Sequence, residues 1–149
     1  MVLRTGLRAA AAAVVLSLAP LAGPVQAAPA TDPLDSLQLH PEWGSVKGKG
    51  GVLRRGCHTY TFSYALTPPQ GIWALEIFIS GPGLKHLGGG AFLGGYDPEA
   101  GSGSYKLCRA TTRYGTFQIE GKLSVDDGAG HIVEGRLPMD KYRLRRPHH

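Results

Sequence analysis

The segment CHTYTFSYALTPPQGIWALEIFISGPG (residues 57–83) decides the fold class. From Cys57 to Leu66, aromatic and aliphatic side chains alternate with small polar ones, which is the period-two pattern of a half-buried strand. Residues 67–71, TPPQG, end that strand, because proline cannot donate to a strand ladder and glycine opens turn geometry. Residues 73–80, WALEIFIS, repeat the alternation with Trp73 on the apolar side. The segment therefore predicts two consecutive strands joined by a turn.

The rest of the chain after residue 44 carries the same kind of signal. Glycine and proline recur about every ten residues, and no window keeps apolar residues at helical spacing for more than two turns. Short strands at this spacing are typical of an all-β sandwich or barrel. We therefore predict a single all-β domain of about seven antiparallel strands over residues 45–149. Beyond the two strands above, the expected segments are residues 45–53, a weak one at 90–94, and 104–108, 116–125, 131–137 and 141–145.

The N-terminus has the three-part layout of a secretory signal peptide. Arg4 and Arg8 precede an apolar stretch over residues 9–22, and small residues around Ala27 form a cleavage site. That stretch contains a proline and is shorter than the roughly 20 residues that a bilayer span needs. We predict a signal peptide over 1–27, a flexible segment over 28–44, and no transmembrane segment after cleavage. The exported protein is then expected to be extracellular or associated with the cell wall.

Cleavage changes the charge balance of the protein. The full chain has 16 Lys and Arg residues against 11 Asp and Glu residues, a net charge of +5. Loss of Arg4 and Arg8 leaves 14 basic against 11 acidic side chains, which is +3. This excess is too small to indicate nucleic acid as the partner.

Cys57 and Cys108 are the two cysteines of the chain. An even number of cysteines in an exported protein usually forms disulfides, because the compartment is oxidising. A nucleophilic role needs a free thiolate, and metal binding needs more ligands at close spacing. Both cysteines lie on the polar faces of their strands, one beginning the second strand and one ending the fifth. We therefore predict a disulfide within one sheet, near its rim.

The strand layout, with Trp73 on the third strand, resembles the immunoglobulin-like or fibronectin-type sandwich of a small secreted bacterial protein. The resemblance covers residues 45–145 and implies that ligands contact the end loops, among them residues 68–71 and 94–103. The turn at Arg113 and Tyr114 is also similar to the Trp-Arg-Tyr turn of small secreted α-amylase inhibitors. Here a threonine replaces the tryptophan and one cysteine pair is absent.

The C-terminal segment is basic on one side. Lys141, Arg143 and Arg145 recur at every second residue, so one side of the last strand is cationic while the residues between them face the core. Such a row can attract acidic glycans or wall polymers through long-range electrostatics. The simpler interpretation, which the sequence favours, is an edge strand that its charges protect from aggregation. With Arg113 and Tyr114, these are the candidate contact residues.

Carboxylates are the remaining candidates for chemistry. Glu76, Glu120 and Glu134 are the residue type that a glycosidase pair requires, yet all three occupy polar faces of predicted strands. The acidic residues within 97–99 and 126–127 do not have the spacing of a known calcium loop. We therefore expect no catalytic residue, no cofactor and no metal ligand set.

These observations favour a secreted, non-catalytic binding protein. Its expected partner is an unidentified protein or a cell-envelope glycan, and nucleic acid is not expected. The alternative hypothesis is a secreted inhibitor of a hydrolase that uses the turn around Arg113 and Tyr114.

Overall fold

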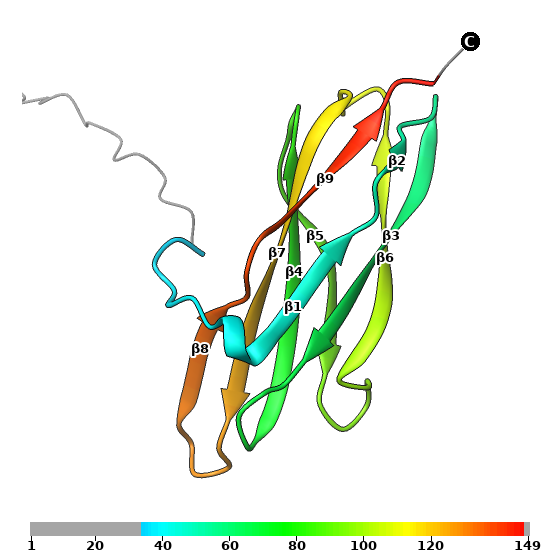
Figure 1. Cartoon of the computed structure of the whole chain (residues 1–149). Coiled ribbons are helices and arrows are strands. Elements are labelled where there is room, and N and C mark those ends of the chain that lie inside the picture. The colour runs from blue at the N-terminus through cyan, green and yellow to red at the C-terminus, as the bar shows by residue number, and fades with distance from the viewer. Residues whose placement is uncertain (1–33, 148–149) are drawn as a thin grey trace, which may run out of the picture. The chain divides into compact units, whose positions relative to one another are not determined.

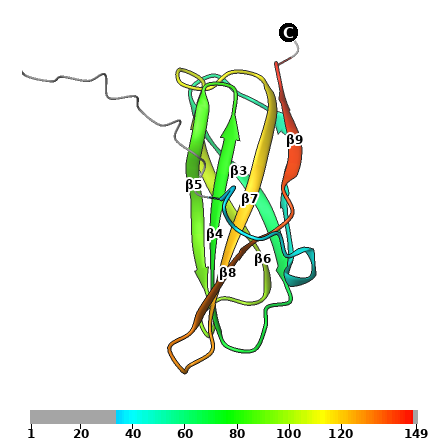
Figure 2. The same cartoon turned by 90° about the vertical axis from the view of Figure 1, so that its left-hand side faces the viewer.

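The structure is a computed structural model that describes residues 34–147. This part of the chain is all-β, and its one helical element is a short 3-10 turn, η1 (Pro41–Trp43). Its strands form two sheets (Figures 1 and 2). They are β1 (Gly44–Gly48), β2 (Gly51–Val52), β3 (Cys57–Leu66), β4 (Ile72–Gly81), β5 (Leu84–Leu93), β6 (Ala100–Cys108), β7 (Gly115–Asp126), β8 (Ile132–Arg136) and β9 (Asp140–Arg145).

The smaller sheet has three strands in the order β1-β3-β6, all antiparallel. The larger sheet has the order β2-β9-β7-β4-β5, and β8 pairs with β7 outside this path. β9 pairs with the first half of β7 and β8 with its second half. The two-residue β2 runs parallel to β9, while the other pairings of this sheet are antiparallel. All-β architecture in two sheets is thus confirmed.

The core lies where the apolar faces of the two sheets meet. Along β4 and β7 every second side chain is buried, as the period-two pattern predicts. The same parity holds in β9, where Tyr142 and Leu144 are buried while Lys141, Arg143 and Arg145 are exposed. The larger sheet contributes Trp73, Leu75, Ile77, Ile79, Phe117, Ile119, Leu123, Val125, Tyr142 and Leu144, and the smaller sheet Val46, Phe62, Tyr64, Leu66, Tyr105 and Leu107.

One polar contact crosses this core. The hydroxyls of Tyr105 on β6 and Tyr142 on β9 are hydrogen-bonded at 2.6 Å, which joins the two sheets. Removal from water raises the pKa of both hydroxyls, that of Tyr105 to about 12. Both groups are therefore neutral at physiological pH, and one hydroxyl donates its hydrogen bond to the other.

The structure differs from the sequence-based prediction in three strands. Residues 45–53 form two strands, β1 and β2, which belong to different sheets. The short strand expected at residues 90–94 is longer in the structure. It is the ten-residue β5, which begins directly after a turn at residues 82–83. Residues 100–103 belong to β6 and not to the preceding loop. Residues 34–147 therefore contain nine strands instead of about seven.

Residues before β1 contact the sandwich. Leu34 is 2% exposed, and the His40 and Trp43 rings stack with their centroids 3.7 Å apart. Backbone hydrogen bonds join this stretch to β8, from His40 N–H to the Arg136 carbonyl and from Arg136 N–H to the Gln38 carbonyl, both 2.9 Å long. The predicted signal peptide and residues 28–33 lie outside the described residues.

The disulfide prediction is confirmed. Cys57 begins β3, Cys108 ends β6, and the two residues are direct partners in the antiparallel ladder. Their Cα atoms are 3.9 Å apart, and the bridge lies on the outer face of the three-stranded sheet at its rim. The sulfur atoms are therefore committed to stabilising one end of the sandwich.

Candidate functional site

The antiparallel topology sorts the loops into two groups at opposite ends of the sandwich (Figure 1). One group contains the connections at residues 53–56, 82–83 and 109–114. Together with residues 143–147 at the end of β9, we call it the cationic end. The other group, the acidic end, contains the connections at 67–71, 94–99 and 127–131 with the adjoining strand ends.

Charge follows this division closely. Within residues 34–147, the cationic end contains no Asp or Glu. The loops of the acidic end contain no Lys or Arg, and its carboxylates are Asp97, Glu99, Asp126 and Asp127. The modest net charge of the chain thus conceals a strongly bipolar molecule. The arginines of the cationic end are Arg54, Arg55, Arg109, Arg113, Arg143, Arg145 and Arg146.

The structure brings two of the candidate contact features together. Tyr114, Arg143 and Arg145, with Arg146, line one hollow of about 450 Å³ beside the end of β9. Their proximity follows from the β7–β9 register, in which Gly115 lies opposite Leu144. Arg143 and Arg145 also line a second hollow, of about 560 Å³, on the β2 side of β9. Both side chains are exposed.

Lys141 lies at some distance from that hollow. It pairs with Gln118 towards the middle of β7, two residues before Arg143 on the same exposed side of β9. Successive residues on one side of a strand are about 7 Å apart. The row of three cations therefore leads from the middle of the larger sheet to its cationic end.

The turn before β7 holds Tyr114 in place. The Arg109 guanidinium carbon lies 4.1 Å from the centroid of the Tyr114 ring, and Arg109 Nη1 donates to the Thr112 carbonyl at 2.8 Å. Tyr114 is half-buried and packs against the core, whereas Arg113 is exposed. Of this pair, Arg113 is the side chain that is available to a partner.

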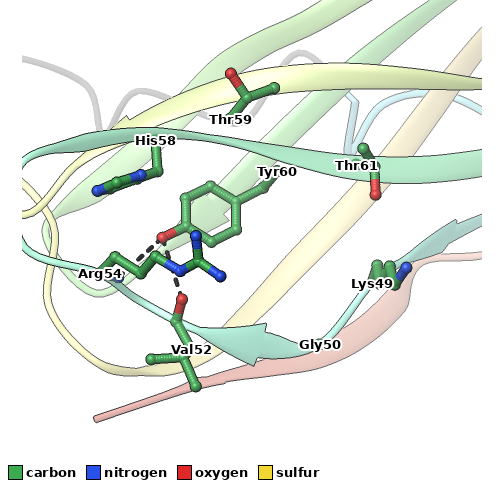
Figure 3. Close-up of a pocket in the computed structure, with 8 residues that line it drawn as sticks. All are labelled: Lys49, Gly50, Val52, Arg54, His58, Thr59, Tyr60 and Thr61. Atoms are coloured by element: carbon green, nitrogen blue, oxygen red, sulfur yellow. Dashed lines mark hydrogen bonds between the residues drawn. The ribbon is translucent and has the colours of Figure 1, made fainter. Parts of the chain in front are cut away.

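Sequence reasoning missed a third hollow at this end, of about 380 Å³, between the start of β3 and the β1–β2 region (Figure 3). Lys49, Arg54 and His58 are among the residues that line it. The Tyr60 hydroxyl donates to the Val52 carbonyl at 3.3 Å and accepts from the Arg54 N–H at 3.1 Å, so it holds β2 beside β3. Arg54 and Arg55 were the available signal, because they stand next to each other just before a strand.

Two of the three glutamates form ion pairs with the same lysine. Lys122 on β7 lies between Glu76 on β4 and Glu134 on β8, with its Nζ 3.5 Å and 2.7 Å from their carboxylate oxygens. The hydrogen bond from Lys122 keeps the pKa of Glu134 below its ordinary value, whereas a general acid needs a raised pKa. Glu120 lies opposite Phe78 on the same β4–β7 ladder. These three glutamates belong to the outer face of the larger sheet.

Within residues 34–147, no three His, Cys, Asp or Glu side chains are close enough together to hold a metal ion. No helix in the same range is long and apolar enough to span a bilayer. Comparison of the chain with protein-family models, curated proteins and solved structures finds no match.

Proposed function

We propose that this protein is an exported, non-catalytic binding module whose cationic end binds an acidic polymer of the cell envelope. The main support for this proposal is the complete separation of charge between the two ends. Within residues 34–147, the cationic end has seven arginines and no carboxylate. A single-sign field of this kind attracts a polyanion and orients the protein towards it. A charge pattern that merely kept the protein soluble would not need to be one-sided.

The residue type supports an oxyanion ligand. All the cations of the cationic end as defined here are arginines, whose planar guanidinium groups bind carboxylate, sulfate or phosphate through two parallel hydrogen bonds. Arg143 and Arg145 stand on one side of β9 with hollows on both flanks. An extended chain of acidic units can follow this row and contact both guanidinium groups.

Edge protection alone accounts poorly for the same row. β9 is an inner strand of its sheet, because it pairs with β7 on one side and β2 on the other. β2 is only two residues long, so part of β9 lacks a strand partner on that side. Even so, Arg143 and Arg145 are exposed on the outer face of the sheet and not along its edge. Ligand binding explains this placement better than protection of an edge.

We further propose that the fold is an immunoglobulin-like sandwich. In that architecture β1, β3 and β6 take the places of strands A, B and E, while β4, β5, β7 and β9 take those of C, C′, F and G. Trp73 on β4 is buried, as is the tryptophan of strand C in antibody domains. Three features are different, namely the additional strands β2 and β8, the lack of a strand D within residues 34–147, and a disulfide that joins neighbouring strands of one sheet.

The alternative, a hydrolase inhibitor, receives less support. Such inhibitors need projecting contact side chains, and Tyr114 is half-buried beneath Arg109.

The test is retention of the purified protein on a column of immobilised dextran sulfate and, separately, on isolated cell envelopes. Arg143→Gln/Arg145→Gln should weaken binding by about 5- to 30-fold, since each exposed ion pair contributes up to about 1 kcal/mol. The matched control is Lys47→Gln/Lys106→Gln, which removes the same charge from the smaller sheet. Both variants should elute at lower salt than wild type, but the arginine variant much earlier.

Equal losses in the two variants would show that only net charge matters and would overturn the proposed site. Binding that survives an ionic strength of about 1 M unchanged would contradict an electrostatic mechanism, because charges are then screened beyond about 3 Å.

A further inference from the structure

The acidic end exposes an unusual amount of apolar surface. The Tyr96 side chain, in the β5–β6 connection, is 90% exposed, and Ile72 and Leu93 are 68% and 48% exposed. Beside them is a hollow of about 390 Å³, lined by residues 68–73, of which Gln70 is polar, and by the two glycines that follow Leu93. Exposed apolar surface of this kind, when bordered by charge, is typical of a protein contact.

Carboxylates border this apolar surface. Glu99 lines the hollow, and Asp126 is the ladder partner of Ile72 on one side and of Ile132, 64% exposed, on the other. Asp127 is held ionised, because hydrogen bonds from the Ala129 N–H and from His131 keep its pKa below the ordinary value. The surface therefore combines a free aromatic ring, apolar walls and a negative border.

This combination is the chemistry that recognises arginine. A guanidinium group stacks on an aromatic face while its N–H groups donate to carboxylates, and its aliphatic stem covers apolar surface. The stacking of a guanidinium group on an aromatic ring already occurs within this protein, where the Arg109 guanidinium carbon lies 4.1 Å from the centre of the Tyr114 ring. An arginine-rich protein surface is thus the partner that the acidic end fits.

We propose that this partner is the cationic end of a second copy of the chain, so that copies associate head to tail. Two acidic ends repel each other, as do two cationic ends, and only the unlike ends attract. The two ends lie at opposite extremes of the strands, so the contact is heterologous and leaves a free end of each kind (Figure 1). Each added copy can therefore bind the next.

The contact uses the same cationic end as the proposed polymer binding, so it is tested without polymer, by sedimentation velocity of the purified protein. At an ionic strength of about 0.01 M, where the Debye length is about 30 Å, the sedimentation coefficient should rise with protein concentration. At about 1 M salt the protein should sediment as a monomer. A wild-type protein that remains monomeric at low salt and high concentration overturns the proposal.

Two variants test the polarity of the contact. Tyr96→Ser/Glu99→Gln alters the acidic end, and Arg54→Gln/Arg55→Gln/Arg113→Gln alters the cationic end. Each variant alone should self-associate at least about tenfold more weakly than wild type. An equimolar mixture should form 1:1 pairs and stop there, because each pair joins the one intact acidic end to the one intact cationic end.

The equimolar mixture of the two variants tests whether the contact is head to tail. Recovery of 1:1 pairs supports the head-to-tail contact, whereas no recovery, with both variants folded by circular dichroism, overturns it. The Tyr96→Ser/Glu99→Gln variant should keep full retention on dextran sulfate. Failure of head-to-tail association and failure of polymer binding are therefore observed separately.

Discussion

Replacing both cysteines, Cys57→Ser/Cys108→Ser, tests the role of the disulfide most directly. The bridge closes a loop with a sequence separation of 51 residues, at the end of a ladder in which each residue of β3 from 57 to 65 has a partner in β6. In the chain-entropy account, a loop of this length restricts the unfolded chain by about 14 cal/mol/K, or about 4 kcal/mol at room temperature. Folded domains of this size are stable by only about 5–15 kcal/mol.

The measurement is equilibrium unfolding in urea for the wild-type protein and the double variant. The variant should lose about 4 kcal/mol of unfolding free energy, and its m-value should rise because the unfolded chain becomes more expanded. The matched control is Ser63→Ala/Ser102→Ala, a directly opposed pair on the same exposed face of the same ladder. That control should change the stability by no more than about 0.5 kcal/mol.

A variant that unfolds within about 1 kcal/mol of the control, with the same m-value, would refute this account of the bridge. It would show that β3 and β6 stay paired at this end of the sandwich without the disulfide.

Two other predictions concern the core around Tyr142. Gly48→Ala should destabilise the protein by about 1–3 kcal/mol, because a Cβ at this position meets the Tyr142 ring, whereas Gly51→Ala, with no atom near its added Cβ, should be close to neutral in the same urea measurement. The second concerns pH: both core tyrosines have raised pKa values, that of Tyr105 reaching about 12, so the folded state holds their protons more tightly than the unfolded state, in which the pKa is about 10. The protonated hydroxyls therefore contribute fully to the free energy of unfolding below about pH 10, and this contribution is lost as the pH rises through about 12. The free energy of unfolding of the wild type should fall over this pH range, and it should fall less in Tyr105→Phe/Tyr142→Phe. Equal pH dependence in the wild type and the double variant would contradict the assignment.

Period-two alternation was sufficient to predict the strands with large side chains. β4 and β7 have the predicted inward faces, and the parity of the two cysteines correctly placed the disulfide within one sheet. These predictions succeeded because each depends on local sequence and on the direction in which successive side chains point.

Glycine caused the main errors. A Cβ on Gly89 of β5 would approach Ile77 and Ile79 to within 2.8 and 2.9 Å, so this glycine is required for close packing and does not mark a loop. In β6, Gly101 and Gly103 face Tyr64 and Phe62, and they continue the inward row towards Tyr105. That period-two row of glycines was a usable signal, since a strand can place glycine opposite a large aromatic ring.

The cationic end was predicted only in part. The alternation of Lys141, Arg143 and Arg145 identified the row on β9 from sequence. Its approach to Tyr114 depends on the register that sets Gly115 opposite Leu144, and the gathering of the other arginines depends on where distant turns meet. Both are long-range properties that no single stretch of sequence contains.

The parallel pairing of β2 with β9 has a mechanical consequence. β1, the first strand, starts at the acidic end, and β9, the last, finishes at the cationic end, so tension on the chain acts along the long axis of the sandwich (Figure 1). Pulled in this way, β2 and β9 slide past each other, and the hydrogen bonds between Gly51–Val52 and Leu144–Arg145 are strained simultaneously instead of opening one after another. A protein held at one extremity and loaded at the other would thus carry part of the load in shear at this short junction.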